Sequence, residues 1–216
     1  MVKQFGYELE FHDASLDLLA EKYQLQKYKK EVQVPYTNYF LKEEIPLTKH
    51  IYLGGESIGY GGEFISPILQ DYEQCLKDLQ FYLKILKDEG AAVQRNSWIT
   101  PFHIHLDRTF LYSREKIEKL LKFLYAFQPE IYELAKGEFD KIRENIFVDF
   151  KPLCGEIIEQ YLRTENEHFF HFKGSCILLD DQTLELRYFN ASLQLNVLET
   201  YFQFAFHLRD YIINEQ

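Results

Sequence analysis

Cysteine is scarce in this chain of 216 residues, which contains three cysteines, Cys75, Cys154 and Cys176. They are far apart and odd in number, and no two of them form a Cys-x-x-Cys pair. A disulfide framework needs paired cysteines, and a structural zinc site needs closely spaced ones. The sequence therefore predicts neither, and a reducing compartment, the cytoplasm, is the expected location.

Long apolar runs and basic runs are also missing. No stretch is apolar for long enough to cross a bilayer, and the first residues lack the basic-then-apolar pattern of a leader. Lys and Arg number 24 against 34 Asp and Glu, which gives a formal net charge of -10. No basic run interleaves with aromatics, so binding to a nucleic-acid backbone is not expected. We expect a soluble protein whose partners are neither membrane nor nucleic acid.

Aromatic and aliphatic residues, by contrast, are plentiful. Hydrophobic residues make up 46% of the chain and aromatics 17%, with 19 Phe and 16 Tyr. This content supports a substantial core, and a chain of this length fits one domain. We find no internal repeat, low-complexity tract or linker. The sequence therefore predicts a single domain over residues 1–216.

Hydrophobic periodicity predicts an α+β domain with a largely antiparallel sheet. Helical spacing occurs over residues 14–30, 71–89, 113–127, 129–147 and 193–213. Strand patterns occur over residues 5–11, 32–36, 63–66, 91–95 and 102–107, and a hairpin is expected over 176–189. A glycine-rich turn over residues 53–62 leads into the strand that begins near Glu63.

Four of the expected strands carry ionisable residues at alternate positions. These are Glu8 and Glu10; Glu63; His103, His105 and Asp107; and Glu185 with Arg187. Alternate side chains of a strand share one face, and the intervening residues here are apolar. If the strands lie side by side, one sheet face packs on helices and the other gathers these groups. Such a face repels itself unless cations sit on it, which indicates a metal site.

Taken in order, these segments resemble the signature of the amidoligase family. They read Gly-x-Glu-x-Glu, Glu-x-x-Ser-Pro, His-x-His-x-Asp and Glu-x-Arg-x-Phe, and the resemblance runs from residue 5 to about residue 195. The family belongs to the carboxylate-amine ligases related to glutamine synthetase and glutamate-cysteine ligase. The resemblance implies a glutamine synthetase-like antiparallel sheet, with helices on one face and a polar, metal-binding funnel on the other.

The resemblance also implies a function. It is that of an ATP-dependent ligase, which forms an amide or peptide-like bond between a carboxylate and an amine through an acyl phosphate. ATP and Mg²⁺ (or Mn²⁺) would be bound, and the substrates would be small molecules or peptides. By resemblance, the metal ligands are Glu8, Glu10, Glu63, His103 and Glu185.

Further residues are expected to act on the nucleotide and the reacting groups. By resemblance, Arg187 faces the phosphate or the acyl phosphate, as a guanidinium can. Either Asp107 or Glu10 would accept the proton of the incoming amine, while His105 would contact the substrate or a metal ligand. By resemblance, an arginine in the middle region of the chain would contact the nucleotide, and the candidates are Arg143 and Arg163. His12 continues the acidic face but is expected at the surface.

Two other functions stay open at this point. A metal-dependent hydrolase could use the same Glu and His cluster to activate water, although the chain has no His-Glu-x-x-His helix. A noncatalytic binding protein of the same fold is the other alternative, because Pro101 and Phe102 stand where family members usually have glycine. The sequence gives no indication of the oligomeric state.

Overall fold

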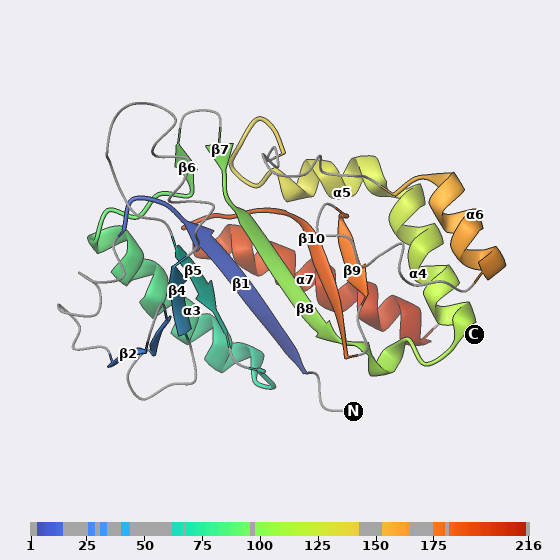
Figure 1. Cartoon of the computed structure of the whole chain (residues 1–216), viewed down its shortest axis with the longest axis horizontal. Coiled ribbons are helices and arrows are strands. Elements are labelled where there is room, and N and C mark those ends of the chain that lie inside the picture. The colour runs from blue at the N-terminus through green and yellow to red at the C-terminus, as the bar shows by residue number, and fades with distance from the viewer. Residues whose placement is uncertain are drawn as a thin grey trace.

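The computed structural model describes residues 4–14, 26–28, 31–33, 40–43, 62–66, 68–95, 98–142, 153–164, 175–179 and 182–214. Over these residues the chain is an α+β protein built on an antiparallel sheet, as the sequence predicts (Figure 1). No helix within them is long and apolar enough to span a membrane.

The described part of the main sheet has eight strands in the order β2-β3-β4-β5-β1-β8-β10-β9. Its strands are β1 (Phe5–Phe11), β2 (Gln26–Tyr28), β3 (Glu31–Gln33), β4 (Phe40–Glu43), β5 (Gly62–Ile65), β8 (Pro101–Asp107), β9 (Ile177–Leu179) and β10 (Thr183–Asn190). A separate hairpin joins β6 (Gln94–Arg95) to β7 (Trp98–Ile99). The central strands β5, β1, β8 and β10 are the four that carry the ionisable motifs.

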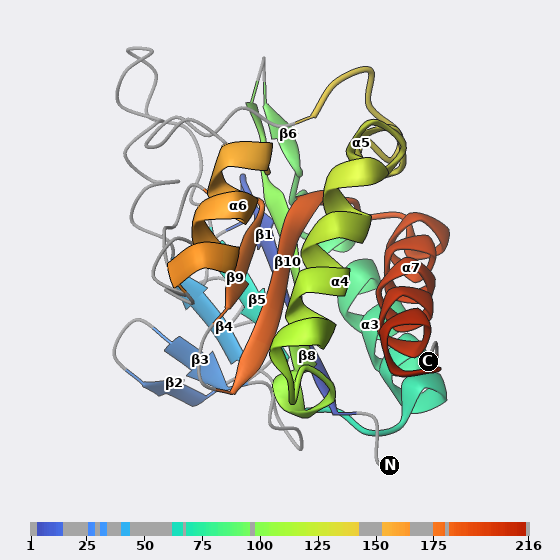
Figure 2. The ribbon, with the colours of Figure 1, turned by 90° about the vertical axis from the view of Figure 1, so that its right-hand side faces the viewer.

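Five α-helices and one 3₁₀ turn accompany these strands in the described residues. They are α3 (Tyr72–Asp88), η1 (Arg108–Phe110), α4 (Arg114–Ala126), α5 (Gln128–Ala135), α6 (Gly155–Thr164) and α7 (Leu195–Asn214). α7 packs on β8 and α5 on β10, and α3 and α4 each contact α7. Figure 2 shows α3, α4 and α7 together on one side of the sheet. α6 contacts α4.

The ends of the helices follow local sequence chemistry. The Asp71 carboxylate accepts the Gln74 backbone N–H at the start of α3, and Gly90 follows its end with a φ of 75°. Ser113 caps α4, as its hydroxyl accepts from the Lys116 backbone N–H. Side-chain oxygens at an N-cap satisfy N–H groups that the first helical turn leaves unpaired.

The core lies between the sheet and the helices and is rich in aromatics. The Phe202 ring of α7 meets those of Phe5, Tyr7 and Phe102, with centroids 5.8, 5.6 and 5.6 Å away. All four side chains are buried. Aromatic rings bury large apolar areas and prefer such tilted or edge-on contacts. This layer fixes the helix-facing side of β1 and β8, so their other side chains face away from the helices.

Two predicted helices are wrong in extent. Residues 26–28 of the expected helix over 14–30 form strand β2, because the Gln26–Tyr28 backbone pairs with Glu31–Gln33. Residues 15–25 lie outside the described residues. The expected helix over 129–147 ends at Ala135, and Gly137 follows with a φ of 60° in contact with Tyr201. A residue in the left-handed region cannot continue an α-helix.

Helix α6 was not predicted, and the glycine-rich turn lies almost wholly outside the described residues. The helix starting at Ser113, the helix over 71–89, the 176–189 hairpin and the C-terminal helix are confirmed within one or two residues of their expected ends. Burial alternates along β1, with every second residue buried from Phe5 to Phe11. The predicted division of this strand into an apolar and a polar face is therefore confirmed.

Candidate active site

The strand register brings three of the predicted metal ligands together. Glu8 of β1 lies opposite His103 of β8, and Glu185 of β10 lies opposite His105. Because β8 runs between β1 and β10, the two carboxylates reach His103 from both sides. Glu8, His103 and Glu185 each offer a ligand atom within 4.8 Å of the others. We call these three residues the triad.

A single imidazole nitrogen contacts both carboxylates of the triad. His103 Nδ1 lies 3.1 Å from Glu8 Oε2 and 3.0 Å from Glu185 Oε1. One nitrogen carries at most one proton, so it cannot donate a separate hydrogen bond to each carboxylate. The other ring nitrogen, Nε2, is buried and has no hydrogen-bond partner among the described residues. The polar atoms of the triad are therefore incompletely satisfied.

The donor atoms of the triad fit a divalent cation. Octahedral Mg²⁺ holds its ligands at about 2.0 to 2.1 Å, which places neighbouring ligand atoms about 3 Å apart. The two distances from His103 Nδ1 match that separation. Two carboxylates and one imidazole also suit Mn²⁺ or Zn²⁺ by donor chemistry. The triad therefore fits a metal ion, and its geometry alone does not select which one.

Burial and pairing shift the pKa values of the triad. Burial raises the pKa of Glu8, but hydrogen bonds and charge from His103 and His105 outweigh it and hold the pKa well below its usual range. Burial likewise opposes the lowering of the Glu185 pKa, which His103 and Arg187 bring about. Burial lowers the pKa of His103, yet its bonds to Glu185 and Glu8 raise it overall. Without metal, the two neighbouring carboxylates therefore favour the protonated form of His103.

Two further predicted residues border the triad. His105 Nε2 lies 3.4 Å from Glu8 Oε1, and Arg187 Nε lies 3.5 Å from Glu185 Oε1. Arg187 sits at a β-bulge, since the β8–β10 register shifts between Leu186 and Phe189. Bulges redirect side chains beside many active sites. Here the guanidinium stays on the same face as Glu185 and close to its carboxylate.

Glu10 and Glu63 lie further along the same face, outside the triad. They face each other across the β1–β5 pair, and Glu63 is buried. Glu8 and Glu10 are alternate residues of β1, so they project from the same side of the sheet. The structure thus places all five predicted ligands on one face but brings only three of them into mutual contact distance.

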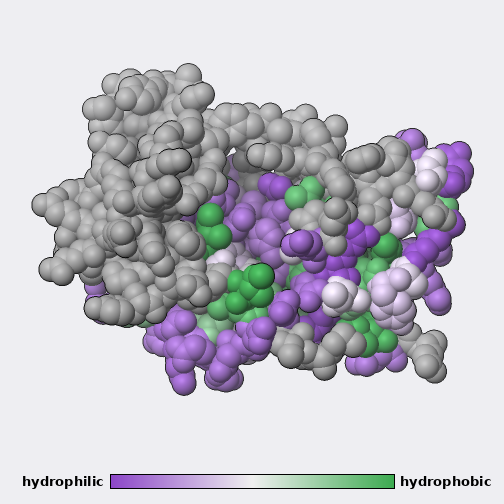
Figure 3. All heavy atoms as spheres, turned by 60° about the horizontal axis from the view of Figure 1, so that its bottom comes forward, coloured by the Kyte–Doolittle hydropathy of each residue, from purple (hydrophilic) through white to green (hydrophobic). Residues whose placement is uncertain are grey.

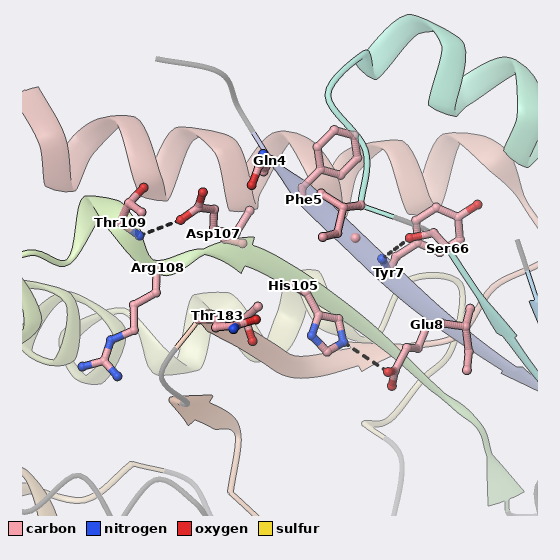
Figure 4. A pocket seen from close by; sticks show the side chains of 15 residues that line it. Gln4, Phe5, Tyr7, Glu8, Ser66, His105, Asp107, Arg108, Thr109 and Thr183 are labelled. Carbon is pink, nitrogen blue, oxygen red and sulfur yellow. Dashed lines mark hydrogen bonds and ion pairs between the residues drawn. The ribbon is translucent and has the colours of Figure 1, made fainter. Parts of the chain in front are cut away.

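A cavity of about 630 Å³ lies on the side of the triad away from Glu10 and Glu63. Glu8, His105 and Asp107 line it together with Ile65, Ile68 and Arg108, among others. Figure 3 shows hydrophilic residues gathered in the hollowed middle of this side of the molecule, with hydrophobic ones beside them. Figure 4 shows the His105 imidazole directed toward the Glu8 carboxylate at this cavity. A cavity of this size holds a small organic molecule.

Two motif residues have structural contacts that the sequence did not reveal. The Asp107 Oδ1 atom accepts the Thr109 backbone N–H at 2.7 Å and caps η1. The Ser66 hydroxyl accepts the Tyr7 backbone N–H at 2.7 Å. The serine of the Glu-x-x-Ser-Pro motif therefore ties the end of β5 to β1, next to Glu8. A serine directly after a strand was the available indication of such a bond.

The remaining candidates lie apart from the triad or outside the described residues. Arg143 falls outside them, so its predicted nucleotide contact stays a prediction. Arg163 is exposed near the end of α6. The prediction for His12 is wrong: it is 5% exposed, and its backbone pairs with Ala92 beyond the end of β1. The sequence did not predict this bridge, because Ala92 is far from His12 along the chain.

Comparison with known proteins agrees with this geometry. Residues 2–208 match the model of a family described as "Putative amidoligase enzyme". No curated protein and no solved structure matches the chain. The match includes all four motifs and every residue of the triad. The chain therefore belongs to the amidoligase family.

Proposed function

We propose that this protein is an ATP-dependent ligase that joins a carboxylate to an amine through an acyl phosphate. The observation that carries the proposal is the position of His103 Nδ1 between the carboxylates of Glu8 and Glu185. Three donors at that spacing fit a divalent cation, and Mg²⁺ is the ion that nucleotide phosphates ordinarily bring with them. Membership of the amidoligase family supports amide formation as the reaction.

The triad would hold Mg²⁺ or Mn²⁺, and Glu10 with Glu63 would supply ligands to a second ion or to bound water. A metal held by these residues would supply positive charge to neutralise and position the phosphates. Arg187 supports this placement, because it lies next to Glu185 on the same face. Its guanidinium can donate two parallel hydrogen bonds to phosphoryl oxygens.

The reaction would proceed in two steps. A carboxylate oxygen of the first substrate attacks the γ-phosphorus of ATP, forming the acyl phosphate and releasing ADP. The amine nitrogen then attacks the acyl carbon, and the carbon–oxygen bond to phosphate breaks as the amide forms. The amine must lose a proton on the way. His105, Asp107 and Glu10 all lie on the same face of the sheet and are candidates to receive it.

The proposal also covers the substrates, the domain organisation and the location of this enzyme. Its substrates are a small-molecule or peptide carboxylate and an amine, and residues 1–216 form one domain. The scarcity of cysteine suits the cytoplasm, where thiols stay reduced. Nucleic acid is not a partner, since the formal net charge of -10 opposes binding to phosphate backbones.

Hydroxylamine trapping tests this proposal directly. The full chain is incubated with ATP, Mg²⁺ and hydroxylamine across a panel of amino acids and dipeptides, and hydroxamate and ADP are measured. We expect both products for at least one carboxylate. Arg187→Ala should lower hydroxamate formation about a hundred- to a thousandfold, as loss of one transition-state contact typically does. Tyr112→Ala, which changes a side chain that is 76% exposed, serves as the control.

Other results would assign another function. Metal-dependent amide hydrolysis without ATP would replace the ligase by a hydrolase. Nucleotide binding with no ADP release for any member of the panel would favour the noncatalytic binding protein.

A further inference from the structure

We infer that the cavity beside the triad binds a primary amine carried on an apolar body of several heavy atoms, rather than free ammonia. This inference rests on the proposed function and adds the class of amine that the ligase uses. It concerns the cavity that Glu8, His105, Asp107, Ile65, Ile68 and Arg108 line.

The position of the cavity separates it from Arg187 and Glu10, which the proposed function assigns to the phosphate and to a metal or bound water. Glu10 and Arg187 lie toward the far end of β1 and β10, beyond the triad. The cavity lies at the near end, where β1 begins and β8 ends, because Gln4, Asp107 and Thr183 line it. Glu8 belongs both to the triad and to the cavity wall. A molecule in the cavity therefore meets the triad from the side opposite Arg187.

The size of the cavity excludes ammonia as a good fit. Its volume of about 630 Å³ compares with a share of about 30 Å³ for one water molecule in the liquid, and ammonia is of similar size. Part of the wall is apolar, since Ile65 and Ile68 line it and Ile68 is 76% exposed. An exposed isoleucine at the mouth of a cavity gains stability when an apolar ligand covers it.

The charges of the cavity favour an ammonium group at one end. Asp107 is oriented by the Thr109 backbone N–H, which binds its Oδ1 atom and leaves Oδ2 available to a ligand. Glu8 adds a second carboxylate to the same wall. Figure 4 shows the Arg108 guanidinium extending away from His105 and Glu8, on the other side of Thr183. A carboxylate that is already positioned and partly enclosed binds a cation with little loss of side-chain freedom.

Calorimetric titration of the full chain with Mg²⁺ and a nonhydrolysable ATP analogue tests this inference. The probes are L-leucinamide, which has a primary amine and an apolar side chain; 4-methylpentanamide, which lacks the amine; and ammonium chloride. We expect L-leucinamide to bind at least about tenfold more tightly than either of the others, because a charged hydrogen bond and apolar contact act together. Equal affinity for ammonium, or no binding of L-leucinamide, would overturn the inference.

Two variants locate the bound amine. Asp107→Asn keeps an oxygen that accepts from Thr109, so η1 stays capped while the charge is removed, and L-leucinamide affinity should fall at least about tenfold. Ile68→Lys should weaken binding similarly, whereas Tyr112→Lys, at the same exposure of 76% but outside the cavity, should not. Unchanged affinity in both cavity variants would contradict the inference. Hydroxylamine trapping uses no large amine, so its failure would instead count against the ligase itself.

Discussion

At the scale of single residues, Glu185 is the most informative position for the metal. Its carboxylate is buried and lies 3.0 Å from His103 Nδ1, so Glu185→Gln keeps the shape and removes the charge. We predict that the substitution weakens Mn²⁺ binding at least about tenfold, because a neutral amide is a poorer ligand for a hard cation. Binding is measured by electron paramagnetic resonance of free Mn²⁺.

Glu130→Gln is the matched control, since Glu130 is an exposed residue of α5 and does not belong to the triad. Its Mn²⁺ affinity should equal that of the unmodified protein. If both variants retained full affinity, the triad would not be the metal site.

The triad also predicts how the stability of the metal-free protein depends on pH. The pKa values of Glu8 and Glu185 are lowered from 4.5, so their contribution is present above pH 4.5 and is lost as the pH falls through the folded values. The pKa of His103 is raised from 6.5, so its contribution is present below pH 6.5 and is lost as the pH rises through the folded value. Between pH 4.5 and 6.5, the two carboxylates and His103 all contribute their full stabilisation of the fold.

We therefore predict that, in EDTA, the triad stabilises the fold most between pH 4.5 and 6.5. Thermal unfolding followed by circular dichroism from pH 4 to 9 measures the dependence. In the unmodified protein, Tm should fall as the pH rises above 6.5. In His103→Gln, this fall in Tm should be smaller. An identical decline in both proteins would show that His103 does not carry the proton.

At the scale of strands and helices, the sequence predicted the regular parts. Alternation along β1 and β8 was readable because each has one apolar face, buried on α7, and one polar face. Strand alternation also fixed which side chains share the triad face, but not which of them meet. That depends on the register across three strands far apart in the sequence, which no local pattern encodes.

The irregular features of the structure were harder to predict from the sequence, because they are not encoded in a local pattern. The bulge in β10 adds one residue between Leu186 and Phe189, and a period of two residues contains no indication of it. The end of α5 is followed by Gly137, which has a positive φ and lies so close to Tyr201 that a side chain there would collide with it. A polar hollow on this face was expected, but the residues that line the cavity were not, since its wall combines residues from four separate segments.

Helix capping gives a prediction at this scale. Asp71 Oδ1 accepts the Gln74 N–H at 3.0 Å, whereas Ser113 Oγ lies 3.4 Å from the Lys116 nitrogen. Asp71→Ala should lower the free energy of unfolding by about 1 kcal/mol, and Ser113→Ala by less. Urea denaturation of both variants measures the difference. A larger loss for Ser113→Ala would contradict the relative strength of these two caps.

At the scale of the whole molecule, metal binding and folding are coupled. The triad joins β1, β8 and β10, so an ion bound there holds only the folded arrangement. Saturating Mg²⁺ or Mn²⁺ at about 100 times the dissociation constant should add about 2.7 kcal/mol of stability. For a chain of this length we therefore predict that Tm rises by about 5 to 10 °C. Differential scanning calorimetry measures the change.

EDTA should reverse this rise, and Glu185→Gln should show a smaller one. A Tm that responds to neither metal, with and without nucleotide, would count against a metal site in the folded protein.

The bulge in β10 lets one strand satisfy two different alternations. Before the bulge, Leu186 pairs with Ile104 and Glu185 belongs to the triad, and Arg187 lies within the bulge next to Glu185. After the bulge, Phe189 pairs with Phe102 and packs on Tyr201. Asn190 then donates to the carbonyls of Lys136 and Lys141. In a strictly alternating strand Phe189 would share a face with Glu185 and Arg187, so the extra residue is what turns Phe189 toward the core. One extra residue thus allows β10 to supply Glu185 to the triad from its first half and Phe189 to the aromatic core from its second half.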